Sequence, residues 1–81
     1  MKLTKAMLAR LREIDSFVPD DHWEYPAFWK SSRTDMALLS RGAIERVDAQ
    51  KRFSGHIEMT VFLCRATDAG RAALAQEKPH E

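Results

Sequence analysis

The most reactive side chains in this 81-residue chain are those of one cysteine, Cys64, and three histidines. His56 and Glu58 have the His-x-Glu spacing of some zinc sites, but a lone cysteine leaves the thiolate ligands of such a site incomplete. A Cys64 thiolate paired with His22 or His56 is the alternative for nucleophilic chemistry. Cys64 lies in an apolar run, where cysteine more often serves as inert core. The sequence therefore predicts a protein that is not an enzyme and holds no metal or cofactor.

The basic residues suggest a different chemistry, the binding of a polyanion. Residues 30–52 contain six Lys or Arg against three Asp or Glu, whereas residues 13–24 contain five acidic residues and no Lys or Arg. A basic half beside an acidic half is typical of a protein that binds a polyanion on one face. Uneven surface charge is equally common on small domains without such a partner.

Aromatic residues are concentrated in one segment, residues 17–29. It holds five of the seven in the chain: Phe17, Trp23, Tyr25, Phe28 and Trp29. Such a group could be a stacking platform or a surface for a protein partner. A short chain also needs its largest apolar side chains in the core, where each buried ring contributes a few kcal/mol. We favour the core interpretation, which a single exposed ring would not contradict.

Length and composition restrict the architecture to one small domain. The chain is 44% apolar and 31% charged, which is ordinary globular composition. No apolar run reaches the roughly 20 residues of a membrane span. A single cysteine provides no disulfide framework. We therefore expect a cytoplasmic protein with one domain over residues 1–76 and a flexible tail over residues 77–81.

Hydrophobic periodicity predicts a first helix over residues 3–14. Its apolar residues recur every three or four positions, Thr4 is a good N-cap, and Arg10 takes another face. Turn residues interrupt the pattern after this helix. Pro26 suits the first turn of a short second helix over residues 26–30.

A third helix is predicted over residues 32–41, with Ser32 as its N-cap. Gly42 stands where the end of a helix needs a positive φ, which glycine adopts without strain. Leu38 and Ala43 then fall where the apolar contact of such a helix end is made.

The rest of the chain predicts a strand over residues 43–48, a polar hairpin loop over 49–56, a strand over 57–66 and a helix over 68–76. Thr67 is the expected cap of that helix, and Gly70 within it indicates a close approach of two backbones. The expected core is one cluster that contains Leu8, Leu11, Leu38, Leu39, Ile44 and Leu74. Cys64 should be buried and unreactive.

Two local motifs resemble those of the winged helix-turn-helix family. Residues 37–46, ALLSRGAIER, are similar to the family's A-L-x-x-R/K-G-L-I-x-R junction between a helix and a strand. Residues 66–74, ATDAGRAAL, are similar to its L-T-x-x-G-R-x-x-L motif after the second strand. The resemblance implies an α+β winged helix-turn-helix fold: three N-terminal helical segments, a two-stranded wing hairpin and a C-terminal helix.

The function that the resemblance implies is that of a small transcription regulator, of bacterial or phage type, that binds duplex DNA. The helix over residues 32–41 would enter the major groove, and a wing loop with Lys51 and Arg52 would contact the backbone or the minor groove. The residues expected at the DNA are Lys30, Arg33, Thr34, Ala37, Ser40, Arg41, Lys51 and Arg52.

A second hypothesis is a winged helix used for protein contact. The aromatic and acidic segment would then be the surface, with Trp23, Tyr25 and Trp29 facing a second copy or another protein. The position of the basic residues distinguishes the two hypotheses. If those of the third helix and the wing loop share one face free of acids, DNA is favoured.

Overall fold

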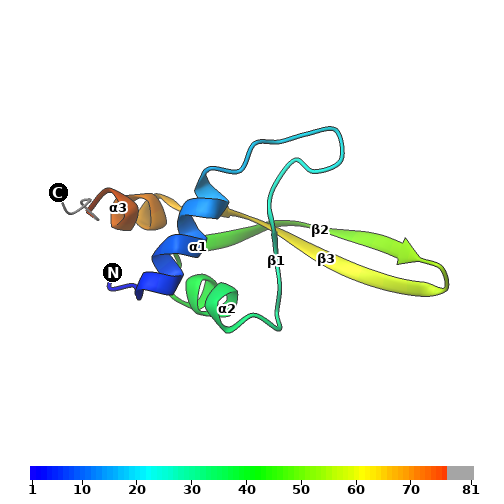
Figure 1. The fold of residues 1–81 in the computed structure, drawn as a ribbon, viewed down its shortest axis with the longest axis horizontal. Helices are drawn as coiled ribbons and strands as arrows, with labels where there is room; N and C mark the ends of the chain where they lie inside the picture. Colours follow the sequence, from blue (N-terminus) through cyan, green and yellow to red (C-terminus); the bar gives the residue numbers. More distant parts are fainter. Residues whose placement is uncertain (77–81) are drawn as a thin grey trace.

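The computed structural model describes residues 1–76, which form three helices and a three-stranded antiparallel sheet of order β1-β3-β2. The elements are α1 (Lys5–Asp15), β1 (Ala27–Phe28), α2 (Arg33–Ser40), β2 (Ile44–Ser54), β3 (Ile57–Ala66) and α3 (Asp68–Gln76). The helices gather at one end, and the hairpin of β2 and β3 projects from them (Figure 1). The molecule is 50 Å long and 25 Å across. The α+β class is confirmed, and the tail expected over residues 77–81 lies outside the described residues.

The short helix expected over residues 26–30 is wrong, because this segment is extended and adds a third strand to the sheet. Phe28 pairs with Phe62 of β3. The carbonyl oxygen of Pro26 accepts a hydrogen bond of 2.9 Å from the backbone N–H of Cys64. Proline suits an edge strand as well as the start of a helix, since neither place needs its missing N–H. Three N-terminal helical segments are therefore also wrong: α1 precedes β1, and α2 alone lies between β1 and β2.

Two predicted side-chain caps set the starts of α1 and α2. The Thr4 hydroxyl accepts a hydrogen bond of 3.2 Å from the N–H of Met7. The Ser32 hydroxyl accepts one of 3.2 Å from the N–H of Asp35. Each bond satisfies one of the N–H groups that a helix leaves unpaired in its first turn.

Gly42, with φ of 74°, ends α2 as predicted. Its N–H donates to the carbonyl of Leu39 at 3.1 Å, and the N–H of Ala43 donates to the carbonyl of Leu38 at 2.9 Å. Together these bonds define a Schellman terminus, which satisfies carbonyl groups at the helix end. Leu38 and Ala43 are both buried in the same apolar cluster, where the prediction placed their contact.

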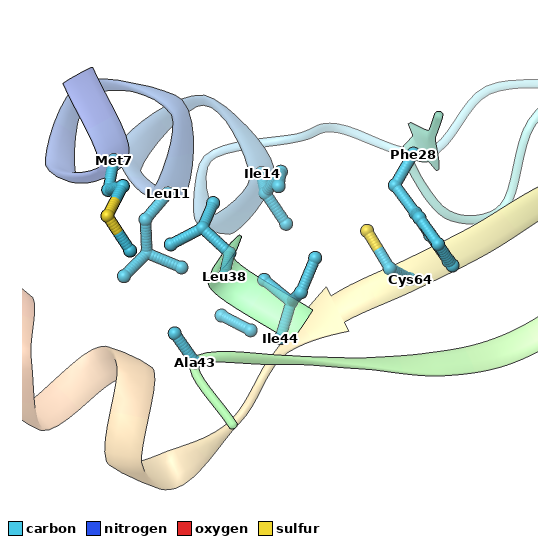
Figure 2. Packing of buried hydrophobic residues seen from close by; sticks show 9 residues of the cluster. Met7, Leu11, Ile14, Phe28, Leu38, Ala43, Ile44 and Cys64 are labelled. Atoms are coloured by element: carbon cyan, nitrogen blue, oxygen red, sulfur yellow. The ribbon is translucent and has the colours of Figure 1, made fainter. Parts of the chain in front are cut away.

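The core lies between the helices and one face of the sheet. It is one cluster of nine buried residues: Met7, Leu11, Ile14, Phe28, Leu38, Ala43, Ile44, Cys64 and Ala66. The side chains of α1 point toward Leu38 and Ile44 (Figure 2). Leu39 and Leu74, also predicted, are half-buried and pack against the cluster, whereas Leu8 is buried outside it. The prediction of one central cluster is therefore confirmed for Leu11, Leu38 and Ile44, while Leu39 and Leu74 lie at its edge and Leu8 lies outside it.

The β2–β3 hairpin is longer than the sequence predicts. Residues 49–56 were expected as a polar loop, but β2 continues through them and pairs with β3 up to Ser54 and Ile57. Only Gly55 and His56 form the turn, and Gly55 has φ of 62°, a conformation that favours glycine. A two-stranded ribbon beyond the helices is solvated on both faces, so polar residues such as Gln50, Lys51 and Arg52 are compatible with a strand there.

The last helix, α3, begins after Thr67 as predicted, and its close backbone approach is confirmed. The Thr67 hydroxyl accepts a hydrogen bond of 3.0 Å from the N–H of Gly70. A β-carbon on Gly70 would collide with the backbone carbonyl of Ala43. That carbonyl accepts a hydrogen bond of 3.0 Å from the N–H of Thr67. α3 therefore docks directly on the turn between α2 and β2.

Replacing Gly70 with alanine is expected to lower the free energy of unfolding by about 1–3 kcal/mol, because the added carbon overpacks a rigid backbone contact. The same substitution in an open helix interior would stabilise the protein by up to about 1 kcal/mol. Chemical denaturation of the two proteins measures the difference. The control is Ala69→Gly, the reverse change at an exposed position one residue away. Ala69→Gly should also lower the free energy of unfolding, because glycine is unfavourable in an open helix interior. A gain in stability for Gly70→Ala would contradict the close contact between α3 and Ala43.

Candidate nucleic-acid interface

The residues of the hairpin alternate between two faces, and residues opposite each other in the ladder share a face. Cys64 and Ala66 lie in the core, so residues on their side of the hairpin form what we call the helix-side face. Toward the tip this face carries Ala49, Lys51, Phe53, Glu58, Thr60 and Phe62. The opposite, or far, face carries Gln50, Arg52, Ser54, Ile57, Met59 and Val61.

Two cations meet over one aromatic ring on the helix-side face. Lys30 Nζ lies 4.5 Å from the centroid of the Phe62 ring, and Arg46 Cζ lies 5.7 Å from it. Attraction of a cation to a ring face contributes about 0.5–1 kcal/mol at an exposed site. Phe28, buried below, packs against the same ring with centroids 5.8 Å apart. Phe62 therefore holds Lys30, from the turn between β1 and α2, beside Arg46 of β2.

A β-bulge places Arg46 and Lys51 on the same face. In a regular strand, residues five positions apart point to opposite faces. Here Arg46 pairs with Cys64 and Asp48 pairs with Leu63, so Val47 between them is an extra residue. The extra residue does not take part in the alternation, so Arg46 and Lys51 are effectively four positions apart and point to the same face. Arg46 is a candidate that the sequence analysis missed, because a bulge has no signal in the spacing of residues.

Four cations make up what we call the basic group: Lys30, Arg33, Arg46 and Lys51. Arg33 is exposed at the start of α2, and the chain keeps its Cα within about 11 Å of that of Lys30. Within residues 1–76, the acidic partner of the group is Glu58, whose carboxylate lies 3.2 Å from Lys51 Nζ. Both side chains are largely exposed, so this pair contributes at most about 1 kcal/mol. A phosphate group could therefore replace Glu58 as the partner of Lys51 with little loss of free energy.

The candidate residues on and after α2 are not equally accessible. Arg33, Ser40 and Arg41 are exposed, and Thr34 is half-buried. Ala37 is half-buried and packs against the core cluster, so the stripe expected along this helix is interrupted at its centre. Arg41 donates from Nη1 to the carbonyl of Lys2 at 3.3 Å, which directs it toward the N-terminus of the chain. Arg33, at the start of α2, is therefore the exposed cation of this stretch that follows Lys30 closely in the chain.

Arg52 lies on the far face, opposite to Lys51, because both belong to a strand and not to a loop. Its guanidinium carbon is 4.2 Å from the centroid of the Trp23 ring. Nη2 donates to the carbonyl of His22 at 3.2 Å and to Gln50 Oε1 at 2.9 Å. Arg52 thus holds the long connection after α1 against the hairpin. The predicted wing residues and those of α2 therefore do not share one face free of acids, so the predicted set of residues does not meet the condition that would favour DNA.

The prediction that the aromatic segment belongs to the core is confirmed for Phe28 alone. Phe28 is buried in the core, and Phe17, Trp23 and Tyr25 are half-buried. Trp29 is the exposed ring of this segment, with 45% of its surface accessible. It borders an open depression of about 560 Å³ between α1 and α2.

A buried ion pair, which the sequence analysis missed, joins α1 to α2. Asp35 is 1% exposed and accepts hydrogen bonds from Arg10 Nε at 2.7 Å and Nη2 at 3.3 Å. It also accepts one of 3.0 Å from the N–H of Trp29, while Arg10 donates to the carbonyl of Ala27 at 2.9 Å. The hydrogen bond to Asp35 raises the pKa of Arg10 above its ordinary value. Helical periodicity predicts an exposed Arg10, and nothing in the sequence pairs residues this far apart.

Cys64 and the potential metal ligands are the other candidates for chemistry that the sequence offered. Cys64 is buried as predicted, and burial raises the pKa of its thiol to about 11, so the thiolate form is rare near neutral pH. No group of three His, Cys, Asp or Glu side chains within residues 1–76 is placed to hold a metal ion. Over the same residues, every helix is too short or too polar to cross a membrane.

Comparisons of the chain with protein-family models, curated proteins and solved structures found no match. The fold and the arrangement of the basic group are therefore the observations on which a function can be argued.

Proposed function

We propose that this protein is a small DNA-binding regulator that contacts duplex DNA with the helix-side face of its hairpin and the start of α2. The observation that carries the proposal is the basic group, because Lys30, Arg46 and Lys51 share the helix-side face of the hairpin. Arg33 follows Lys30 by three residues, and Glu58 is the acidic partner of the group within residues 1–76. Phosphate contacts of this kind provide most of the affinity for DNA. The two motifs similar to those of winged helix-turn-helix proteins support the same function.

The two parts of this surface have different roles in the proposal. Arg46 and Lys51 on the hairpin contact phosphates, which fixes the position of the protein on the duplex without reading its sequence. Arg33 at the start of α2 reaches base edges, where an arginine can donate two hydrogen bonds to guanine. α2 has eight residues and is about 12 Å long, enough for one base-contacting end. A single copy should therefore bind weakly, and two copies on two half-sites would bind more tightly.

Replacing Arg46 with alanine is expected to weaken binding to all duplexes alike. The slope of log affinity against log salt concentration should decrease in magnitude by about 1, because one fewer phosphate is neutralised. Arg33→Ala should instead cost about 1–3 kcal/mol, chiefly on the preferred sequence. Retention of mixed and selected duplexes between about 50 and 200 mM salt measures both quantities.

The matched control for this experiment is Arg65→Ala. Arg65 belongs to the same hairpin but shares the far face with Glu45, to which it forms an ion pair of 3.0 Å. Arg65→Ala changes the net charge of the protein by the same amount as Arg46→Ala. Because Arg65 does not face the DNA in the proposed complex, its removal should leave the salt slope unchanged. Equal slopes for the two variants, or no retention of any duplex at about 50 mM salt, would exclude the proposed interface.

A protein-contact module remains the second candidate, and one observation favours it. Trp29 is exposed beside a depression that α1 lines with Ala6 and Ala9 and α2 with Thr34. An exposed tryptophan next to small side chains is a typical anchor point for a partner. If DNA is not retained, Trp29→Ala is the first variant to test for loss of a protein contact.

A further inference from the structure

The tip of the hairpin is apolar where a solvated turn is usually polar. Phe53 is 71% exposed, Ile57 is 64% exposed and Met59 is 43% exposed. These are three of the six large apolar side chains that are exposed within residues 1–76. They lie at most three residues from the two-residue turn, at the end of the molecule farthest from the helices (Figure 1). Fold stability does not explain them, since none belongs to the core cluster.

The two faces of the ribbon both carry apolar side chains at this tip. Phe53 lies on the helix-side face, and Ile57 and Met59 lie on the far face. A flat partner surface can cover only one face of a ribbon, so it would leave part of this apolar surface in water. A partner that surrounds the tip, as a groove or as two separated layers, covers both faces. The partner must therefore enclose the tip from both sides, whatever its chemistry.

The chemistry of the neighbouring residues favours DNA as this occupant. Phe53 lies two residues beyond Lys51 on the same face, so the tip continues the surface of the basic group. The ladder is paired to its last residues, Ser54 and Ile57, and the turn is tight, so the tip is held in one orientation. Minor-groove proteins insert apolar side chains, phenylalanine and isoleucine among them, between base steps and bend the duplex by about 20–90°.

We propose that the hairpin tip inserts into the minor groove of the bound duplex, with Phe53 and Ile57 as wedges that unstack a base step and bend the DNA. This inference rests on the proposed function, because the basic group must first hold the duplex. It adds a second property to that function: the protein changes the shape of its DNA as well as binding it. Flexible pyrimidine–purine steps would then be preferred at the wedge, since they are the easiest to kink.

The test uses a duplex of about 30 base pairs that carries a donor and an acceptor dye at its two ends. Retention and energy transfer are measured in the same samples for the full chain and for Phe53→Ser/Ile57→Ser. The full chain should bring the two ends closer together. The double variant should be retained with affinity reduced no more than several-fold and should leave the duplex straight. Both side chains are exposed, so these substitutions leave the core unchanged.

The control is Val18→Ser, which removes an apolar side chain that is 79% exposed but lies in the connection after α1. It should bend the duplex as the unmodified chain does. Retention of a straight duplex by the unmodified chain, or equal bending by the double variant, overturns the wedge and leaves the proposed function standing. Absence of retention overturns both. Sedimentation of the protein alone tests the rival occupant: a dimer that the double variant abolishes would assign the tip to a second copy.

Discussion

Replacing Asp35 with alanine is expected to lower the free energy of unfolding by about 3 kcal/mol, because it leaves a partly buried arginine and a backbone N–H without their acceptor. Removing one partner of a buried ion pair typically costs about 3–5 kcal/mol. The lower end of this range applies here, because the Arg10 side chain is 26% exposed and can form hydrogen bonds with water once Asp35 is removed. The N–H of Trp29 also loses the Asp35 carboxylate. Chemical denaturation with an unchanged m-value would measure the loss.

Glu13→Ala is the matched control for Asp35→Ala. Glu13 forms the other ion pair of Arg10, at 3.3 Å, but its side chain is 69% exposed. Exposed pairs contribute about 0.2–1 kcal/mol, so this variant should be close to the unmodified protein in stability. A double-mutant cycle between Arg10 and Asp35 then isolates the buried pair. If Asp35→Ala costs no more than Glu13→Ala, the pair is not the connection between α1 and α2 that the geometry indicates.

The ion pair also bears on the proposed DNA surface. Asp35 holds the N–H of Trp29, and Ser32 caps the helix that starts at Arg33. Lys30 lies between these fixed points, with its amine over Phe62. Loss of Asp35 should therefore disorder the junction between β1 and α2 from which two cations of the basic group project.

Replacing Leu38 with alanine is expected to lower the free energy of unfolding by about 2–5 kcal/mol, the range for a leucine removed from a packed core. Leu38 is completely buried and lies among side chains from α1 and β2 (Figure 2). The carbonyl of Leu38 is part of the Schellman terminus and accepts a hydrogen bond of 2.9 Å from the N–H of Ala43, which fixes the backbone at this position. Limited collapse around a fixed backbone leaves a cavity, which places the loss in the upper part of that range.

Leu39→Ala is the control, because it makes the same chemical change one residue along the same helix. Leu39 is half-buried and packs only at the edge of the cluster. Less apolar surface is lost there, so the destabilisation should be less than half that of Leu38→Ala. Equal losses for the two variants would show that the core is centred elsewhere.

Local signals in the sequence determined where most elements begin and end. Thr4 and Ser32 cap helices because a side-chain oxygen satisfies a backbone N–H a few residues away. Gly42 ends α2 because a positive φ is needed there. The close approach at Gly70 was also predictable, since glycine inside a helix is otherwise unfavourable. Each of these effects acts within a few residues, so each can be inferred without knowing the fold.

Segments without such a local signal were decided by tertiary pairing. Residues 26–30 have Pro26 at a position that suits a helix, yet Phe28 is buried only when the segment pairs with β3. Residues 49–56 are polar enough for a loop, but each of residues 49–54 pairs with a residue of β3. Hydrogen bonds to a neighbouring strand outweighed composition in both places.

The composition of the candidate site was likewise decided by the tertiary structure. The sequence placed Lys51 and Arg52 together in one wing loop, whereas strand alternation sends them to opposite faces. Arg52 then stacks on Trp23, and the bulge at Val47 brings Arg46 to the face of Lys51 in its place. The types and number of cations are properties of the sequence. Which of them meet depends on strand register, and one inserted residue reverses the face of every side chain beyond it.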